Sequence, residues 1–170
     1  RQRSPGSRSP IGRGPAGQVQ GKRAERDAAD RAHLERHGWR VRDSHEVAGR
    51  PDGFRAYIQG SRGEFSCAKP SSVEFRNASV SDRSVCYLAS GKPIVVQDTG
   101  QSNYLPDGEG IFRFSSLPQA AAAFDAIESD YRRQCDAARA LAEKHFDARR
   151  VLEGALNGSL GRASAPTANA

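Results

Sequence analysis

The most constraining feature of this chain is a short apolar run, Pro93-Ile94-Val95-Val96-Gln97, which passes directly into the polar turn Asp98-Thr99-Gly100. Apolar residues that follow one another, instead of alternating with polar ones, are typical of a strand buried on both faces. Such strands occur in parallel sheets whose two faces are covered by helices. The run therefore predicts a central strand of an α/β fold that ends in a loop at the carboxyl edge of the sheet.

The residues before this strand predict a short helix. Ser81 stands where an N-cap belongs, and Gly91 supplies the left-handed residue that ends many helices. Between them, Val85, Leu88 and Ala89 form the expected buried stripe. A helix that leads at once into a buried strand is typical of an α/β crossover.

Similar patterns predict further elements along the chain. We expect strands at 39–41, 64–69 and 111–114, and helices at 22–37, at 51–60, from 116 onward and from 147 onward. Strands that alternate with helices predict a parallel sheet flanked by helices. These strands are too few for a complete two-lobed enzyme, so we expect an α/β, Rossmann-like half of a larger architecture.

Composition separates the two ends of the chain from this core. Residues 1–21 are rich in Arg, Ser, Pro and Gly, which predicts a disordered leader. We expect an exposed helix at 22–37, the α/β domain at 38–157 and a flexible tail at 158–170. The net charge is +6, of which +4 falls in residues 1–30, so the domain itself is close to neutral. A nearly neutral domain offers no basic face for nucleic acid, so we do not expect nucleic acid as a partner of the domain.

The chain carries no signal for a membrane or for secretion. No stretch approaches the roughly 20 apolar residues of a membrane span, and the N-terminus lacks the apolar core of a signal peptide. We therefore expect a cytoplasmic protein with no membrane span. The three cysteines, Cys67, Cys86 and Cys135, are far apart and odd in number, which predicts small core residues in a reducing compartment and neither a disulfide framework nor a metal site.

The candidate binding site lies around the entry to the Ser81 helix. The amides at a helix N-terminus attract anions, and an arginine in the first turn, here Arg83, adds a bidentate phosphate donor. In an open parallel sheet, ligands bind outside the carboxyl ends of the strands. This rule brings Lys69, at the end of one strand, together with Thr99 and Gly100, at the end of the next. The arrangement predicts a diphosphate pocket.

Residues 81–156 resemble the carboxyl-terminal, nucleotide-sugar-binding domain of GT-B glycosyltransferases. The likeness is closer to the family 1-like group that includes spore-maturation proteins of the CgeB/YkvP type, and it takes in SRGEFSCAK at 61–69 and SDRSVCYLASGKPIVVQDTG at 81–100. The residues that carry it are Arg83, Ala89, Gly91, the strand Ile94 to Gln97, and Gly110.

This resemblance implies a transferase that binds a nucleotide-diphospho-sugar donor and passes the glycosyl group to an acceptor that we cannot name. It implies no cofactor or metal. The amino-terminal acceptor lobe has no counterpart here, so we expect the chain to be incomplete on its own and to work with an N-terminal lobe or a partner chain. The substrate-binding residues implied are Lys69, Ser81, Asp82, Arg83, Thr99 and Gly100.

At two positions where the family pattern has an acidic residue, this chain has another residue. These positions are Cys86 and Ala78, and a thiol cannot accept the two ribose hydroxyls as a carboxylate does. Asp82 or Glu64 could stand in for them. No catalytic base is identified.

Two further hypotheses belong to other classes of protein. The domain could be a non-catalytic interaction module of the same fold, docking a partner on an apolar face. Alternatively, the basic residues 1–30 could bind nucleic acid with steep salt dependence. Two local motifs carry less weight. Asp98-Thr99-Gly100 occurs once and fits a turn better than an aspartic-protease signature, and His33 with His37 has zinc-ligand spacing on a helix but no third ligand.

Overall fold

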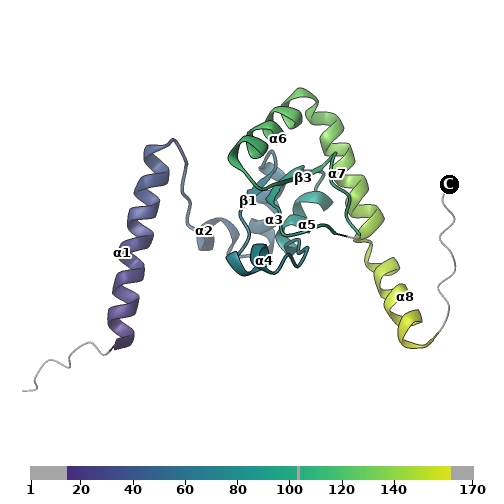
Figure 1. Cartoon of the computed structure of the whole chain (residues 1–170), viewed down its shortest axis with the longest axis horizontal. Helices are drawn as coiled ribbons and strands as arrows, with labels where there is room; N and C mark the ends of the chain where they lie inside the picture. The colour runs from purple at the N-terminus through teal and green to yellow at the C-terminus, as the bar shows by residue number, and fades with distance from the viewer. Residues whose placement is uncertain (1–14, 103, 162–170) are drawn as a thin grey trace, which may run out of the picture. The chain divides into compact units, whose positions relative to one another are not determined.

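The computed structural model describes residues 15–102 and 104–161. The chain divides between Val47 and Ala48 into two compact units (Figure 1). The expected α/β domain began at residue 38, so its first ten residues, 38–47, fall in the first unit and the remainder in the second. The candidate site belongs entirely to the second unit.

The first unit contains one long helix, α1 (Pro15–Arg36), and the start of a short one, α2 (Ser44–Ala48). Helix α1 begins inside the segment expected to be a disordered leader, because proline suits the first helical position and the following Ala and Gln residues favour helix. Residues 1–14 of that leader lie outside the described residues, and with them nearly half of residues 1–30, the segment of the nucleic-acid hypothesis.

The strand expected at 39–41 is not formed, and this prediction is wrong. The segment between α1 and α2 has no regular secondary structure, and Trp39 is 55% exposed. Alternation of apolar and charged residues suits a strand only where a neighbouring strand is available for pairing. The described side chains of α1, from Glu25 to Arg36, are all exposed, as expected for the helix at 22–37.

The second unit is built on a three-stranded parallel sheet with the order β1-β2-β3. Its strands are β1 (Glu64–Ser66), β2 (Ile94–Gln97) and β3 (Ile111–Phe114). The parallel sheet and its central buried strand are confirmed, since Ile94, Val95 and Val96 of β2 are all buried. Strand β1 is shorter than the expected 64–69: its pairing with β2 ends at Ser66, the Ala68 amide donates to the Gln97 side chain, and Lys69 is the N-cap residue of a helix that was not foreseen, α4 (Pro70–Glu74).

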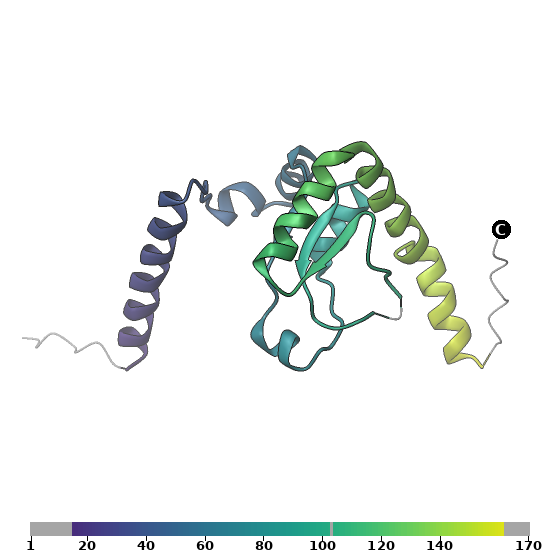
Figure 2. The ribbon, with the colours of Figure 1, turned by 45° about the horizontal axis from the view of Figure 1, so that its top comes forward.

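Helices cover both faces of this sheet (Figure 2). One face packs against α3 (Pro51–Gly60), α5 (Asp82–Ala89) and α7 (Tyr131–His145). Its core contains Ile58, Tyr87, Leu88, Ile94, Val96, Ile111, Ala138 and Ala142. The other face packs against α6 (Leu117–Ser129), through Val95, Phe114, Ala120, Ala123 and Ile127. The fold is therefore α/β and compatible with a Rossmann-like half.

Helix α5 is rotated relative to the expected buried stripe. Ser84, Tyr87 and Leu88 are its buried residues, whereas Val85 is half-buried and Ala89 is exposed. The predicted ends of this helix are confirmed: Ser81 accepts a hydrogen bond from the Ser84 amide, and Gly91 has a φ of +64°.

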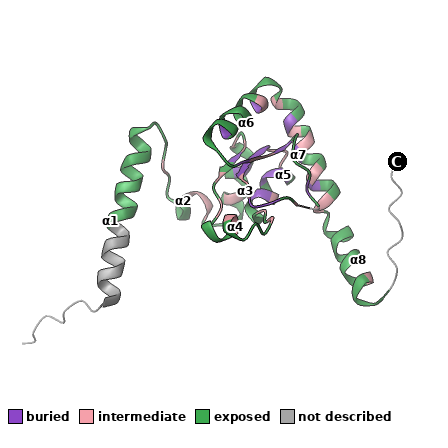
Figure 3. Cartoon of the chain, viewed as in Figure 1, coloured by how far each residue is buried: buried purple, intermediate pink, exposed green. Residues whose placement is uncertain are grey.

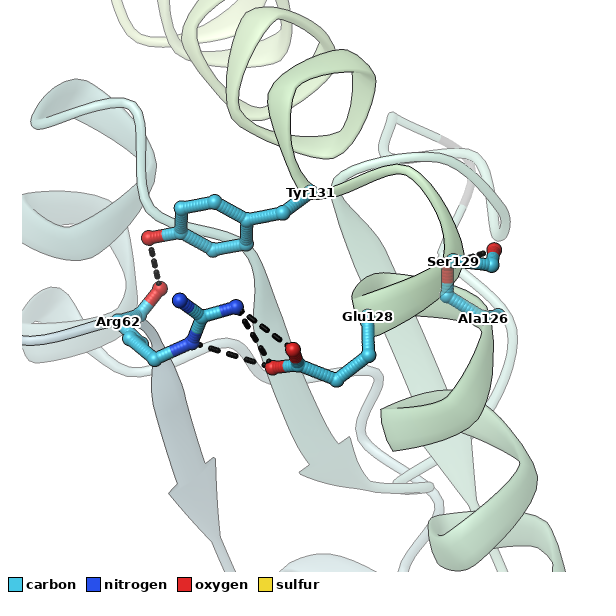
Figure 4. Close-up of polar contacts among 5 residues, drawn as sticks. All are labelled: Arg62, Ala126, Glu128, Ser129 and Tyr131. Carbon is cyan, nitrogen blue, oxygen red and sulfur yellow. Dashed lines mark hydrogen bonds and ion pairs between the residues drawn. The ribbon is translucent and has the colours of Figure 1, made fainter.

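A polar clamp joins the loop before β1 to the corner between α6 and α7 (Figure 4). The Arg62 guanidinium donates to both carboxylate oxygens of Glu128 at 2.8 Å and lies 4.2 Å from the centre of the Tyr131 ring. The Tyr131 hydroxyl donates to the Arg62 carbonyl at 2.7 Å. Burial, followed by a hydrogen bond with the Cys135 thiol, raises the pKa of Tyr131 to about 12. The clamp therefore ties the corner between α6 and α7 to the amino end of β1, whereas the candidate site lies at the carboxyl ends of the strands.

The chain continues into α8 (Ala148–Ser159), which is capped by Asp147 as the sequence predicts. Nearly all of its side chains are exposed (Figure 3). Val151, Leu152 and Leu156 are 53–62% exposed although they are apolar. Within the part of the chain that the structure describes, no helix combines the length and apolarity needed to cross a membrane.

Candidate functional site

A cavity of about 380 Å³ opens at the carboxyl ends of β1 and β2. The segment after β1, the turn before α5 and the end of β2 form its walls. Four of the six predicted binding residues line it: Lys69, Ser81, Arg83 and Thr99. Asp82 and Gly100 are not among the residues that line it. The position agrees with the rule that ligands of open parallel sheets bind beyond the carboxyl ends of the strands.

The backbone amides at the start of α5 are partly used within the helix itself. Ser81 Oγ accepts from the Ser84 amide at 3.1 Å, and Asp82 Oδ1 accepts from the Arg83 amide at 2.9 Å. A carboxylate at this end also neutralises part of the positive helix dipole. The amides of Arg83 and Ser84 are therefore engaged, and Lys69 and Arg83 are the cationic side chains among the residues that line the cavity.

Arg83 is held in place by Glu64, the first residue of β1. Its Nε donates to Glu64 Oε1 at 2.8 Å, and the Glu64 side chain is only 4% exposed while that of Arg83 is 50% exposed. Glu64 was one of two candidates to accept ribose hydroxyls. Because its Oε1 accepts from Arg83 Nε, the Glu64 carboxylate fixes the position of the Arg83 guanidinium.

The other cation at the cavity is Lys69. Pro70 holds the Lys69 backbone extended, as the sequence predicts, with φ −63° and ψ 141°. The Lys69 side chain is exposed at the rim, and within residues 15–102 and 104–161 it has no ion-pair partner. An ammonium group on a flexible stem can follow a mobile phosphate, whereas Arg83 offers a fixed fork of donors.

The loop that leads into α5 forms part of the cavity wall and is strained. Arg76 and Ala78 have φ values of +45° and +55°, which non-glycine residues rarely adopt. The Ala78 amide donates to the Thr99 carbonyl at 2.8 Å, and Thr99 Oγ1 donates to the Ser79 carbonyl at 3.0 Å. Backbone strain of this kind persists where the surrounding structure fixes it, and it gathers at functional sites.

Gly100 supports this wall without reaching the cavity. It has a φ of +110°, and a Cβ at this position would stand 2.7 Å from the Arg76 carbonyl oxygen. Its amide donates to Asp98 Oδ1 at 2.9 Å, which makes Asp98-Thr99-Gly100 a turn closed on its own side chain. Asp98 also pairs with Arg76 at 3.7 Å, so its carboxylate is engaged in the turn and its ion pair.

The sequence reasoning missed a buried arginine on β3. Arg113 is 7% exposed at its side chain and pairs with Asp107. Burial lowers the pKa of Arg113, and nearby Asp98 opposes that effect. Within the described residues, its Nη2 has no hydrogen-bond partner. The available signal was a charged residue inside the apolar strand Ile111 to Phe114, which requires a counter-ion.

The remaining predicted features lie elsewhere. The cysteines are not all core residues, since Cys67 and Cys86 are exposed and Cys135 is half-buried. Tyr104 is 80% exposed and lies outside the cavity lining. The His33 and His37 rings lie 4.6 Å apart, but among the residues placed by the structure no three His, Cys, Asp or Glu side chains gather as a metal site.

Comparison of the chain with known protein families, with curated proteins and with solved structures gives no match. What can be said of function therefore rests on the sequence motifs and on the geometry of the cavity.

Proposed function

We propose that the second unit binds a nucleotide-diphospho-sugar in the cavity and serves as the donor-binding domain of a glycosyltransferase. The observation that supports it is the position of Arg83: this residue lines a cavity at the carboxyl ends of two parallel strands, and its guanidinium is held by the buried carboxylate of Glu64. The sequence motifs around Arg83, Gly91 and the β2 strand point to the same class of ligand.

The chemistry follows from where charge develops. When the bond between a sugar and a diphosphate breaks, the sugar gains oxocarbenium character and negative charge grows on the leaving phosphate. Fixed positive groups lower the barrier if they stand where that charge appears. Arg83 and Lys69 have this role in our proposal, with Thr99 and Ser81 shaping the pocket. The acceptor is bound by an N-terminal lobe or a partner chain.

We place this activity in the cytoplasm. Cys67 and Cys86 are free and exposed. Exposed free thiols persist in a reducing compartment, whereas secreted proteins of this size generally pair them.

Calorimetric titration with UDP, GDP, UDP-glucose and GDP-mannose tests the proposal. We expect at least one of them to bind and Arg83→Ala to weaken that binding about 10- to 100-fold, because a hydrogen bond to a charged group contributes about 1.5–3 kcal/mol. Lys69→Ala, which removes an exposed side chain, is expected to weaken it by a smaller factor. Arg132→Ala is the matched control, since it removes a positive charge from a side chain that is 88% exposed on α7. Absence of binding by all four compounds at millimolar concentration would refute the proposal.

A second candidate function is supported by α8. Its apolar residues Val151, Leu152 and Leu156 are exposed, as in a helix that packs against a partner. A non-catalytic interaction module predicts self-association or complex formation that depends on these residues. Light scattering of the wild type and of a Leu152→Glu, Leu156→Glu variant tests it, and a monomer in both samples would exclude self-association.

A further inference from the structure

A second cavity, of about 500 Å³, lies at the other end of α5 from the candidate site. The candidate site adjoins the first turn of α5, whereas the second cavity adjoins the last residue of this helix and the turn that follows it. The eight residues of α5 span about 12 Å, so the two cavities are distinct. Helices α3 and α7 supply the remaining walls, through Arg55, Gln59, Cys135, Asp136 and Arg139.

The carbonyl groups at the end of α5 are all engaged, so they do not oppose an anion as free carbonyl groups would. Those of residues 86–88 accept from backbone amides of the following turn. The Ala89 carbonyl accepts from Arg139 Nη1 at 2.6 Å, and Arg139 Nε donates to Glu143 Oε1 at 2.7 Å. These two bonds fix the Arg139 guanidinium at the cavity wall and leave the other donors of its fork available to a ligand.

A second guanidinium lines the same cavity from α3. None of the described residues forms an ion pair with Arg55 or accepts a hydrogen bond from it. Asp136 also lines the cavity, and its Oδ2 accepts from Arg132 Nε at 3.3 Å. Two cations against one carboxylate leave the lining net positive. Because each guanidinium can donate to two oxygens of one anion, arginines on two different helices suit a phosphate group.

The other polar groups of the lining both donate and accept hydrogen bonds. Gln59 and Ser90 use neither capacity of their side chains toward the rest of the described chain, and Asp136 Oδ1 is free of the bond that engages Oδ2. The Cys135 thiol is a weak partner and is already hydrogen-bonded with Tyr131. Hydroxyl groups of a ligand donate and accept in the same way. The lining therefore combines a phosphate clamp with groups that suit hydroxyls.

We propose that this second cavity binds a small sugar phosphate. Its phosphate group lies between Arg55 and Arg139. Its hydroxyl groups bind Gln59, Ser90 and Asp136. The proposal goes beyond the proposed function and does not depend on it, because it uses a different cavity and none of the residues assigned to the donor.

The first experiment compares glucose 6-phosphate, ribose 5-phosphate, inorganic phosphate and glucose by calorimetry on the full chain. We expect at least one sugar phosphate to bind about tenfold or more tightly than inorganic phosphate, and glucose not to bind, since charge and hydroxyl groups both contribute. Absence of binding by both sugar phosphates at about 10 mM, a weak affinity on any scale for metabolites, would overturn the proposal. Equal affinity for inorganic phosphate would also overturn it, because the hydroxyl groups would then contribute nothing.

The second experiment assigns the binding to this cavity. We expect Arg55→Ala to weaken sugar-phosphate binding about 10- to 100-fold with little change in melting temperature, because its exposed side chain has no partner to lose. Gln59→Ala should weaken the sugar phosphate but leave the affinity for inorganic phosphate unchanged. Arg149→Ala is the matched control for charge, since it removes an arginine side chain that is 86% exposed on α8.

Arg83→Ala separates the two cavities. It removes the guanidinium of the candidate site and should leave sugar-phosphate affinity unchanged. A loss of affinity in Arg83→Ala as large as that in Arg55→Ala would overturn the proposal, because the ligand would then occupy the candidate site. Unchanged affinity in Arg55→Ala would overturn it as well.

Discussion

The pair formed by Arg83 and Glu64 makes a measurable prediction about stability. Removal of the guanidinium by Arg83→Ala leaves the Glu64 carboxylate, only 4% exposed, without its cation. Breaking a buried ion pair from one side costs about 3–5 kcal/mol in general. Here the Arg83 side chain is 50% exposed, so water enters the space it leaves and screens the carboxylate. We therefore expect the free energy of unfolding to fall by about 1–3 kcal/mol.

A double-mutant cycle separates this cost from loss of packing. Glu64→Gln keeps an oxygen that can accept from Arg83 Nε and removes the charge, so we expect it to cost less than Arg83→Ala. Adding Glu64→Gln to Arg83→Ala removes the stranded charge and should restore part of the stability. The coupling energy between the two positions is then about 1–2 kcal/mol, within the usual range for contacting residues. Urea unfolding followed by far-UV circular dichroism measures all four proteins.

Two results would refute this reasoning. If Arg83→Ala unfolds at the same urea concentration as the wild type, the carboxylate does not depend on the guanidinium. If the double variant loses the sum of the two single losses, the residues act independently and Glu64 does not position Arg83. In either case the orientation of Arg83 would lose its physical basis, although Lys69 would still line the cavity.

Three further perturbations test other parts of the fold. The pKa of Tyr131 is raised to about 12, above the value of about 10 for an unfolded chain, so the folded state holds the phenol proton more tightly. The free energy of unfolding should therefore fall as the pH rises from about 10 to about 12. Urea unfolding across this range should show a flatter pH dependence in Tyr131→Phe. Gly110→Ala should cost about 3 kcal/mol or more, since φ is +80° and a Cβ would stand 2.5 Å from the Ala138 nitrogen; a melting temperature equal to that of the wild type would contradict this. Asp107→Asn should lower the free energy of unfolding by about 1–3 kcal/mol, because it removes the charge that pairs with buried Arg113. Thermal unfolding of the double variant Asp107→Asn, Arg113→Met tests whether this loss comes from the ion pair.

Features that depend on neighbouring residues could be predicted from the sequence. The β2 strand, the Ser81 cap and the Gly91 stop follow from the chemistry of a few adjacent residues, and all three are present. The approximate location of the cavity was also predictable, because the carboxyl ends of parallel strands necessarily lie at one edge of the sheet.

Features that depend on contacts between distant residues could not be predicted in this way. Glu64 and Arg83 are 19 positions apart, and nothing near either residue indicates that the two side chains meet. The segment at 39–41 has the alternation of a strand but no neighbouring strand to pair with, so it stays irregular. Helix α4 was missed for a different reason: its Pro-Ser-Ser start resembles a loop, although Pro70 occupies the first helical position that proline favours.

The site and the hydrophobic core share residues, and this decides which variants can report on function. Ser84 is only 1% exposed and Val96 is 9% exposed, and both line the cavity while packing inside the unit. Substitutions there would change binding and folding together. Substitution of Arg83 would also change both binding and stability, because its guanidinium pairs with the buried Glu64 carboxylate. Lys69 lies at the rim with an exposed side chain, so Lys69→Ala should alter the affinity for diphosphates without changing the free energy of unfolding by more than about 0.5 kcal/mol. It is therefore the variant that separates recognition of the ligand from stability of the fold.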